Sequence, residues 1–269
     1  MTVDDDGLRR ARFLIAYHGA RFRGLAPNHG VRTVMGDLAT AVETVTRRPF
    51  EYSMSGRTDA GVHGWGQVIS GDLPPDTDLA GLARRLNTMC RPDIAVRSID
   101  WAGPDFDARF SATWREYRYH VWNDAAPNPL LADQVWHVIR PLDLPAMQAG
   151  CAGLVGEHDF TSFCRRPKVD AEHPLPSMVR IVHSARWMRV DDSPLLRFEI
   201  RGSAFCHQQV RSTVGTLVDI GLHRLPPDAV PAIIEARDRA AAGQVAPPEG
   251  LVLWQVGYDG GRWDAPSSD

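Results

Sequence analysis

The chain has 269 residues, of which 43% are hydrophobic, so it can build a sizeable core as one large domain or two modest ones. A net charge of −3 and a pI of about 6.4 exclude a uniformly basic nucleic-acid-binding protein, but a local basic cleft is compatible with them. No run approaches the roughly 18 apolar residues of a membrane span, and residues 1–7 lack the apolar core of a secretory signal. The scattered cysteines (Cys90, Cys151, Cys164 and Cys206) show no metal or disulfide spacing, which predicts a reduced, cytoplasmic protein.

Hydrophobic periodicity and turn residues predict strands and helices along the whole chain. Strands are expected at residues 12–17, 67–73, 94–101, 115–122, 179–190, 195–201 and 251–258. Helices are expected from Thr33 and at residues 78–89, 144–154, 207–220 and 228–242, whereas residues 156–168 are expected to form a loop. Gly103-Pro104 is expected to be a hinge between residues 1–103 and 104–269. The order lacks the strict alternation of a doubly wound sheet and predicts an α+β protein built from two similar halves.

The stretch from Ser55 to His63 (SGRTDAGVH) holds an acid, a base, a hydroxyl and a histidine in one expected loop. Small residues there let backbone approach a ligand closely, and loops on a rigid scaffold often carry reactive side chains. A plain polar turn, in which Asp59 bonds a nearby backbone N–H, is the alternative interpretation. A metal-dependent hydrolase that uses Asp59 and His63 is a weaker one.

A cationic partner for such a carboxylate is suggested by residues 204–217 (AFCHQQVRSTVGTL). There Arg211 stands among apolar helix neighbours, and a charge rarely becomes buried without a partner. The alternative is an ordinary exposed arginine on a helix.

The string Gly56–His63, followed by Gly66-Gln67-Val68, resembles the signature of the tRNA pseudouridine synthase A family. Residues 204–217, 156–160 (GEHDF) and 246–251 also match patterns of that family, so the resemblance covers nearly the whole chain. It implies a pseudouridine synthase fold, in which two ferredoxin-like halves join into a mixed, mainly antiparallel sheet with helices around it and a central cleft.

The resemblance also implies an activity: a cytoplasmic homodimeric isomerase converts uridine to pseudouridine in the anticodon stem-loop of tRNA, without a metal or organic cofactor. A carboxylate suits this reaction because it can attack carbon or stabilise a cation-like sugar. Asp59 would be the nucleophile and Arg211 its partner. Tyr117 would stack on the everted uridine, although its place in an expected strand also suits a core tyrosine.

Basic side chains would supply the remaining contacts to RNA, although each could equally be ordinary surface. Arg57 and Arg109 are expected to bind the substrate, Arg109 within a string (DARF) that is similar to the family's His-Ala-Arg-Phe. Contacts to the RNA backbone are expected from Arg21, Arg23, Arg165, Arg166 and Lys168.

Two departures from the family pattern bear on the choice of substrate. Leu25-Ala26-Pro27-Asn28 replaces a usual Trp-Gln segment after Gly24, and Asp107 stands where histidine is usual. The proposed chemical residues are intact, so the reaction is kept. The altered loop nevertheless motivates an alternative, a catalytically weak tRNA-binding or chaperone paralogue on the same scaffold.

Overall fold

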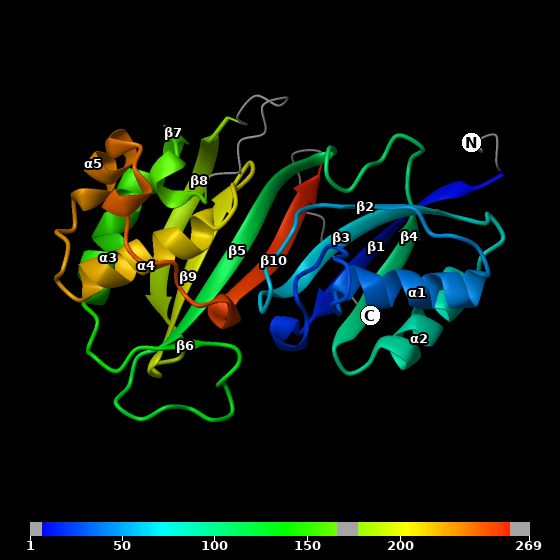
Figure 1. Cartoon of the computed structure of the whole chain (residues 1–269), viewed down its shortest axis with the longest axis horizontal. Helices are drawn as coiled ribbons and strands as arrows, with labels where there is room; N and C mark the ends of the chain where they lie inside the picture. The colour runs from blue at the N-terminus through cyan, green and yellow to red at the C-terminus, as the bar shows by residue number, and fades with distance from the viewer. Residues whose placement is uncertain (1–6, 166–176, 259–269) are drawn as a thin grey trace. The chain divides into compact units, whose positions relative to one another are not determined.

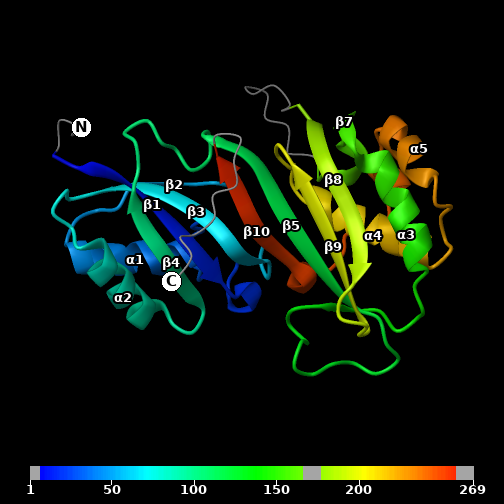
Figure 2. The same cartoon turned by 180° about the vertical axis from the view of Figure 1, so that it is seen from behind.

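The computed structural model describes residues 7–165 and 177–258 of the chain. By compactness the chain divides into two units, one formed by residues 1–113 with 252–269 and the other by residues 114–251. Figure 1 labels the helices and strands of both units, and Figure 2 shows them from behind. The expected division between residues 103 and 104 stays a prediction.

The first unit follows the order β–α–β–β–α–β. Its strands are β1 (Arg9–Tyr17), β2 (Tyr52–Met54), β3 (His63–Leu73) and β4 (Ile94–Trp101), and its helices are α1 (Val34–Thr46) and α2 (Leu79–Cys90). The strand order is β4-β1-β3, with β2 also paired to β3, and all these pairs are antiparallel. This is the ferredoxin-like arrangement. The last strand, β10 (Leu251–Tyr258), pairs with β3 in parallel, so the sheet is mixed.

Helices α1 and α2 lie on one side of this sheet, where the core of the first unit forms (Figures 1 and 2). Alternate residues of β1, such as Phe13 and Ile15, are fully buried against helix residues such as Leu38 and Leu86. Local chemistry sets where the helices begin, because Thr33 Oγ1 accepts from Gly36 N–H before α1 and the Asp78 carboxylate accepts from Gly81 N–H before α2. The sequence predictions of both helix starts are confirmed.

The second unit contains the order β–α–β–β–α together with additional short strands and one further helix at its end. It contains β5 (Ala112–Trp122), α3 (Leu144–Gly150), β7 (Gly156–Asp159), β8 (Val179–Arg189), β9 (Leu195–Gly202), α4 (Gln209–Gly221) and α5 (Ala229–Ala236). The strands run in the antiparallel order β5-β9-β8-β7, and short β6 (Trp136–His137) pairs with β5 in parallel. Helix α4 covers one face of β8 and β9 (Figures 1 and 2). The α+β class and the two similar halves are therefore confirmed.

Three local expectations were wrong. Residues 156–159 form strand β7 by pairing with β8, where a loop was expected. The helix expected to run to residue 242 ends at Ala236, because Arg237 takes a left-handed conformation (φ 48°) and Asp238 then caps a separate 3-10 turn. Cys164 and Cys206 form a disulfide, with their Cα atoms 5.9 Å apart, although their spacing of 42 residues carries no disulfide signal.

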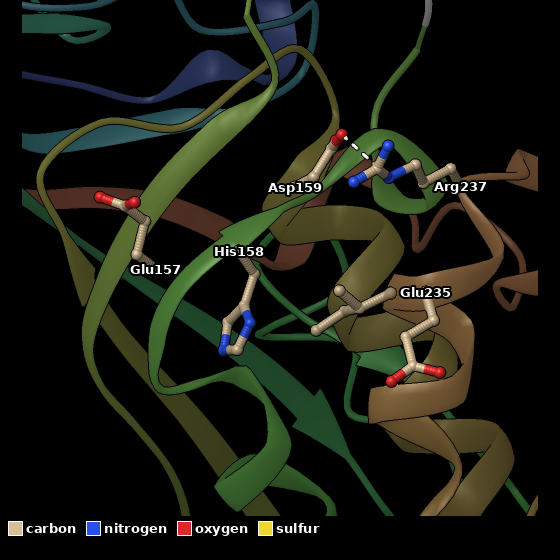
Figure 3. Close-up of a pocket in the computed structure, with 6 residues that line it drawn as sticks. Glu157, His158, Asp159, Glu235 and Arg237 are labelled. Atoms are coloured by element: carbon tan, nitrogen blue, oxygen red, sulfur yellow. Dashed lines mark ion pairs between the residues drawn. The ribbon is translucent and has the colours of Figure 1, made fainter.

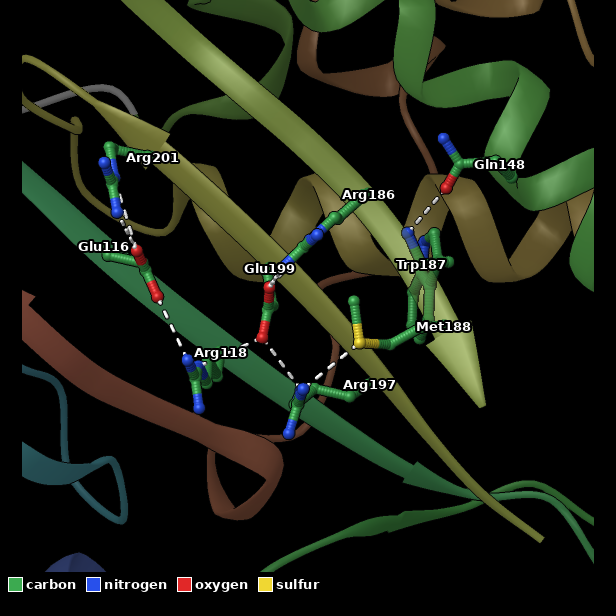
Figure 4. A network of polar contacts seen from close by, with 9 residues as sticks. All are labelled: Glu116, Arg118, Gln148, Arg186, Trp187, Met188, Arg197, Glu199 and Arg201. Carbon is green, nitrogen blue, oxygen red and sulfur yellow. Dashed lines mark hydrogen bonds and ion pairs between the residues drawn. The ribbon is translucent and has the colours of Figure 1, made fainter. Parts of the chain in front are cut away.

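Charged side chains form a network on β5, β8 and β9 of the second unit (Figure 4). Two almost fully buried carboxylates are each held by more than one guanidinium group. Glu199 is paired with Arg118 at 3.2 Å, with Arg197 at 2.9 Å and with Arg186. Glu116 is paired with Arg201 at 2.7 Å and with Arg118 at 3.4 Å. Such a pair stabilises the fold only while both charges are present, because a lone buried charge is costly.

The Glu199 carboxyl makes this network sensitive to acid. Burial alone would raise its pKa, but the hydrogen bond from Arg186 and the charges of Arg118, Arg197 and Arg186 together lower the pKa below the ordinary value. A lowered folded-state pKa means that the stabilisation is present above the unfolded-state pKa of about 4.3 and is lost as the pH falls through the folded-state value.

We therefore expect Glu199→Gln to lower the free energy of unfolding by about 1–3 kcal/mol at pH 7. The difference from the native chain should shrink as the pH falls below about 4.3, because the unfolded chain then binds a proton that the folded carboxyl, with its lowered pKa, still resists. Urea unfolding at pH 7 and pH 3 measures this, with the exposed Glu235→Gln as the matched control. An equal difference at pH 7 and pH 3 would contradict the proposed titration.

Candidate active site

The Asp59 loop connects β2 to β3 and is pinned at both ends. On its first side, Gln67 of β3 is fully buried, and its amide accepts from the Ser55 hydroxyl and donates to the carbonyl of Gly56 at 2.8 Å. Next to Asp59, the buried Thr58 hydroxyl is hydrogen-bonded to the Tyr17 hydroxyl at 2.8 Å. The loop is therefore held by side chains of the two neighbouring strands β1 and β3.

A second segment, residues 18–25, packs its backbone against this loop. The Leu25 N–H donates to the carbonyl of Thr58 at 3.2 Å, and the Gly19 N–H donates to His63 Nδ1 at 3.0 Å. A Cβ on Gly19 would collide with the carbonyl oxygen of Val62. Glycine is therefore required for this close approach.

Asp59 itself is half-buried within this framework. Its carbonyl accepts from Val62 N–H at 3.2 Å, and Gly61 takes a positive φ of 82° in the same turn. A half-buried carboxylate on a fixed loop is a suitable general base or nucleophile, because its position does not have to be reorganised for the reaction.

His63 is buried at the start of β3, and its Nδ1 accepts the hydrogen bond from Gly19. This contact gives His63 a role in holding the two loop segments together. Within residues 7–165 and 177–258, no group of three or more His, Cys, Asp or Glu side chains is arranged to hold a metal ion.

Arg211 lies in the first turns of α4, in the second unit, and is half-buried. Its Nε donates to the carbonyl of Ala246 at 2.7 Å, and its own carbonyl accepts from Ala246 N–H at 3.1 Å. The guanidinium is thus fixed by a segment 35 residues further along the chain. Because Asp59 and Arg211 belong to different compact units, their pairing stays a prediction.

Tyr117 lies on β5 and is only 9% exposed. Its ring packs edge-on against Phe205, with centroids 5.3 Å apart and planes at 90°. Phe205 thus fixes the orientation of the tyrosine ring, and the stacking of Tyr117 on a base stays a prediction.

The expected RNA-binding residues are spread over both units. Arg57, Arg23 and Arg109 are exposed in the first unit, where Arg21 is also paired with Asp93 at 3.6 Å. Arg165 is exposed in the second unit. Arg166 and Lys168 lie outside the described residues, and none of these predicted contacts is tested by the structure.

The two departures from the family pattern have structural roles. Leu25 is fully buried in the core of the first unit, where it also donates to the Thr58 carbonyl. Asp107 caps a turn, because its Oδ1 accepts from the N–H groups of Arg109 and Phe110 at 2.7 and 2.8 Å. Both residues therefore support segments that lie next to candidate site residues.

A polar pocket of about 400 Å³ lies between β7 and α5 in the second unit (Figure 3). It is lined by Glu157, His158, Asp159, Ile234, Glu235 and Arg237. Asp159 faces Arg237, with an ion pair of 3.3 Å. Asp159 Oδ1 also accepts from Thr161 N–H at 3.0 Å, so this carboxylate is occupied in holding the turn after β7. Of the predicted site residues that the structure describes, none lines this pocket.

Sequence reasoning missed the residues that position the Asp59 loop. Tyr17 was assigned to the core of a strand, and Gln67 was noted only as part of the signature. One signal for Gln67 was available in the sequence, because it is a polar residue at the start of an otherwise apolar expected strand. A polar side chain that becomes buried in such a strand usually makes a specific hydrogen bond.

Comparisons with known proteins agree with these motifs. The model of a family described as tRNA pseudouridine synthase matches residues 151–259. The chain is 39% identical over 262 residues to a tRNA pseudouridine synthase A of Gluconobacter oxydans, covering 96% of this chain and 92% of that protein. It is 41% identical to the tRNA pseudouridine synthase A of Frankia casuarinae, covering 94% of this chain and 90% of that protein. It is 38% identical to that of Bacillus subtilis, covering 93% of this chain and 99% of that protein.

A solved structure, that of a Cbf5-Nop10-Gar1 complex, matches over 78% of this chain and 44% of that chain, with 13% identity. Its TM-score of 0.32 is too low to carry an argument. The sequence relatives do support a family assignment, because each of them matches over at least 90% of its own length at 38% identity or more. The chain belongs to the tRNA pseudouridine synthase A family.

Proposed function

We propose that this chain isomerises uridine to pseudouridine in the anticodon stem-loop of tRNA, with Asp59 as the nucleophile. Its membership in a family of isomerases supports the reaction class. The observation that carries the proposal is the fixed loop around Asp59. Tyr17, Gln67 and the 18–25 segment hold this loop from three sides, while the carboxylate stays partly accessible.

The reaction breaks the bond between the sugar C1′ and N1 of uracil, turns the base, and joins C1′ to C5; C5 then loses a proton and N1 gains one, so the product is an isomer of the substrate. The Asp59 carboxylate can add to carbon or stabilise the cation-like sugar, and a general base can take the C5 proton. The Arg211 guanidinium would compensate the carboxylate charge. Tyr117 would offset the lost stacking of the everted base, which amounts to roughly 1–3 kcal/mol for each base–aromatic stack.

The domain roles and the RNA contacts form part of the same proposal. Residues 1–103 would carry the Asp59 loop, and residues 104–269 would carry Tyr117 and Arg211. Arg57 and Arg109 would bind the substrate. The backbone contacts would come from Arg21, Arg23, Arg165, Arg166 and Lys168.

Incubation of the purified protein with unmodified tRNA transcripts, followed by mapping of pseudouridine, tests the proposed activity. Product within the anticodon arm is the expected result. Salt-dependent tRNA binding without product would favour the weak or chaperone-like alternative. Turnover that a chelator abolishes would favour the metal-dependent hydrolase.

We also propose a homodimer in the cytoplasm, where tRNA is modified. Sedimentation of the purified chain tests the dimer.

Among the described residues, no helix is long and apolar enough to cross a membrane. Disulfides are rare in a reducing compartment, so the cytoplasmic proposal requires Cys164 and Cys206 to be neighbouring thiols in the cell. Alkylation in intact cells, followed by mass spectrometry, tests this point.

The Tyr17→Phe variant is expected to react more slowly than the native chain while it binds tRNA equally well, because the Tyr17 hydroxyl positions the Asp59 loop. The change removes the hydroxyl that holds Thr58, and it leaves the buried Thr58 hydroxyl without this partner, at a cost of about 1–2 kcal/mol. Because Thr58 precedes Asp59, we expect kcat to fall by about three- to tenfold, since small displacements of a reacting group lower the rate. The dissociation constant for tRNA should not change.

Tyr52→Phe on the adjacent strand β2 is the matched control, because its hydroxyl makes no hydrogen bond within the described part of the chain. Single-turnover rates and filter-binding affinities measure the two effects. A Tyr17→Phe variant with unchanged kcat would show that the Thr58 contact does not position the nucleophile.

A further inference from the structure

Phe110 is an aromatic side chain held in solvent by a rigid turn. It is 79% exposed, although full burial of such a side chain would contribute roughly 1.5–3 kcal/mol. The residue lies in the connection between β4 and β5, one position after Arg109. The Arg109 guanidinium stands 5.2 Å from the centre of the Phe110 ring. This connection thus presents a flat apolar ring next to a cation just before β5 begins.

The turn that carries Phe110 is closed by hydrogen bonds on both of its sides. The Asp107 carboxylate accepts from the N–H groups of Arg109 and Phe110, and the Asp107 carbonyl accepts from the N–H of Ser111 at 3.0 Å. The Ser111 hydroxyl in turn accepts from the N–H of Asp107 at 3.1 Å. These bonds fix the backbone of residues 107–111, so the exposed ring is not on a freely moving loop.

The same turn is anchored to three strands of the first unit. The Ser53 hydroxyl on β2 donates to Asp107 Oδ1 at 3.1 Å. The Ala108 N–H donates to the buried Ser70 hydroxyl on β3 at 2.9 Å, and its carbonyl accepts from the buried Tyr258 hydroxyl on β10 at 2.9 Å. These bonds hold the backbone of the turn, so the Phe110 ring stays in solvent, contributes nothing to the core and is available for contact with another molecule.

We infer that Phe110 stacks on an unpaired base of the RNA substrate, with Arg109 beside it for the adjoining phosphate. This inference rests on the proposed tRNA-modifying function and adds a substrate contact to it. A flat ring suits a base because every base has a flat face, and a guanidinium suits a phosphate because it carries charge and paired N–H donors. An apolar protein partner would fit the ring but would not use the neighbouring cation.

Exchange of Phe110 for residues of different shape tests this inference. Phe110→Ala should weaken binding of a tRNA transcript by about 5- to 150-fold, the range that one base–aromatic stack gives. Phe110→Leu should bind nearly as weakly, because it is apolar but not flat. Phe110→Trp should bind within about threefold of the native chain, because it restores a stacking surface. Thermal stability should be unchanged in all three variants, since the ring is exposed.

Leu130→Ala is the matched control, because this side chain is 85% exposed but aliphatic, and its loss should not affect tRNA binding. Ultraviolet crosslinking of the native complex should join Phe110 to a nucleotide. Unchanged affinity of Phe110→Ala, or full affinity of Phe110→Leu, would overturn the inference. The inference is also overturned if Phe110→Ala weakens tRNA binding only because this variant self-associates less than the native chain does.

The experiment separates this inference from the proposed function. If the native chain forms pseudouridine and Phe110→Ala binds tRNA normally, the stacking contact is wrong and the function stands. If the native chain forms no pseudouridine but Phe110→Ala still weakens tRNA binding, the contact stands and the catalytic proposal is wrong.

Discussion

Asp59→Asn is expected to lower the rate of pseudouridine formation by at least about a thousandfold, the scale of loss seen when an essential catalytic group is removed. Asparagine has nearly the same shape as aspartate, but its amide is neither an anion nor a nucleophile of comparable strength. The loop should keep its conformation, because Tyr17, Thr58, Gln67 and the neighbouring backbone make contacts that hold it.

The affinity for tRNA and the thermal unfolding temperature should therefore stay close to those of the native chain. Single-turnover assays with saturating enzyme measure the chemical step without the contribution of product release. Asp76→Asn is a suitable control, because this carboxylate is exposed in the connection between β3 and α2. Asp59→Glu should also lose most activity, because one added methylene displaces the carboxylate by more than the reaction tolerates.

Two results would contradict the assignment of Asp59. Full turnover by Asp59→Asn would show that another group performs the chemistry. A large loss of tRNA affinity in this variant would show that Asp59 acts in binding. Loss of the rate alone, with folding and binding intact, is the pattern that a nucleophile predicts.

Much of the fold could be predicted from the sequence where local chemistry decides the structure. The starts of α1 and α2 follow from the capping residues Thr33 and Asp78, whose side chains act within three residues. The strand at residues 12–17 follows from its apolar residues. In such segments the preference of each residue agrees with the final structure, so sequence alone is sufficient.

The elements that were missed depend on distant pairing. Strand β7 (Gly156–Asp159) has a polar sequence without the pattern of a strand, and it forms because its backbone pairs with β8, whose partner residues lie 20 to 26 positions further along the chain. The early end of α5 is set by the left-handed residue Arg237 and by the cap at Asp238. Helix propensity alone does not predict this break in an alanine-rich segment.

In the candidate site, too, features marked by a local motif could be predicted, and contacts between distant residues could not. The Asp59 loop could be found from its sequence because a long motif marks it. The contact of Tyr17 with Thr58 could not, because 41 residues separate the two and no local pattern relates them. The anchored turn of Phe110 likewise joins Asp107 to Ser53, 54 residues earlier. Sequence motifs thus identify reactive residues more readily than the residues that position them.

Arg211→Ala is expected to lower kcat by about a hundredfold or more. An opposite charge at about 4 Å contributes roughly 4 kcal/mol at an effective dielectric near 20, before desolvation is counted. If Arg211 compensates the Asp59 carboxylate in the reacting complex, its removal loses much of that energy in the transition state. The change also removes the hydrogen bond from Arg211 Nε to the Ala246 carbonyl, so stability should fall by about 1–3 kcal/mol.

The electrostatic and structural roles of Arg211 can be separated by chemical rescue. Millimolar guanidinium should restore part of the kcat of Arg211→Ala, because the free ion can occupy the vacated position and supply the charge. It should not restore the lost stability to the same extent. Arg211→Lys should keep more activity than Arg211→Ala, because it retains a cation although it lacks the planar group that reaches Ala246.

Arg224→Ala is the matched control for this series. Arg224 is an arginine just beyond the end of α4 that is paired with Asp219 at 2.8 Å and is 52% exposed. Its removal should leave kcat and rescue by guanidinium unaffected, because a surface ion pair contributes little. If Arg211→Ala loses stability but keeps its kcat, the guanidinium only tethers α4 to residue 246. In that case the proposed compensation of the Asp59 charge by Arg211 is wrong.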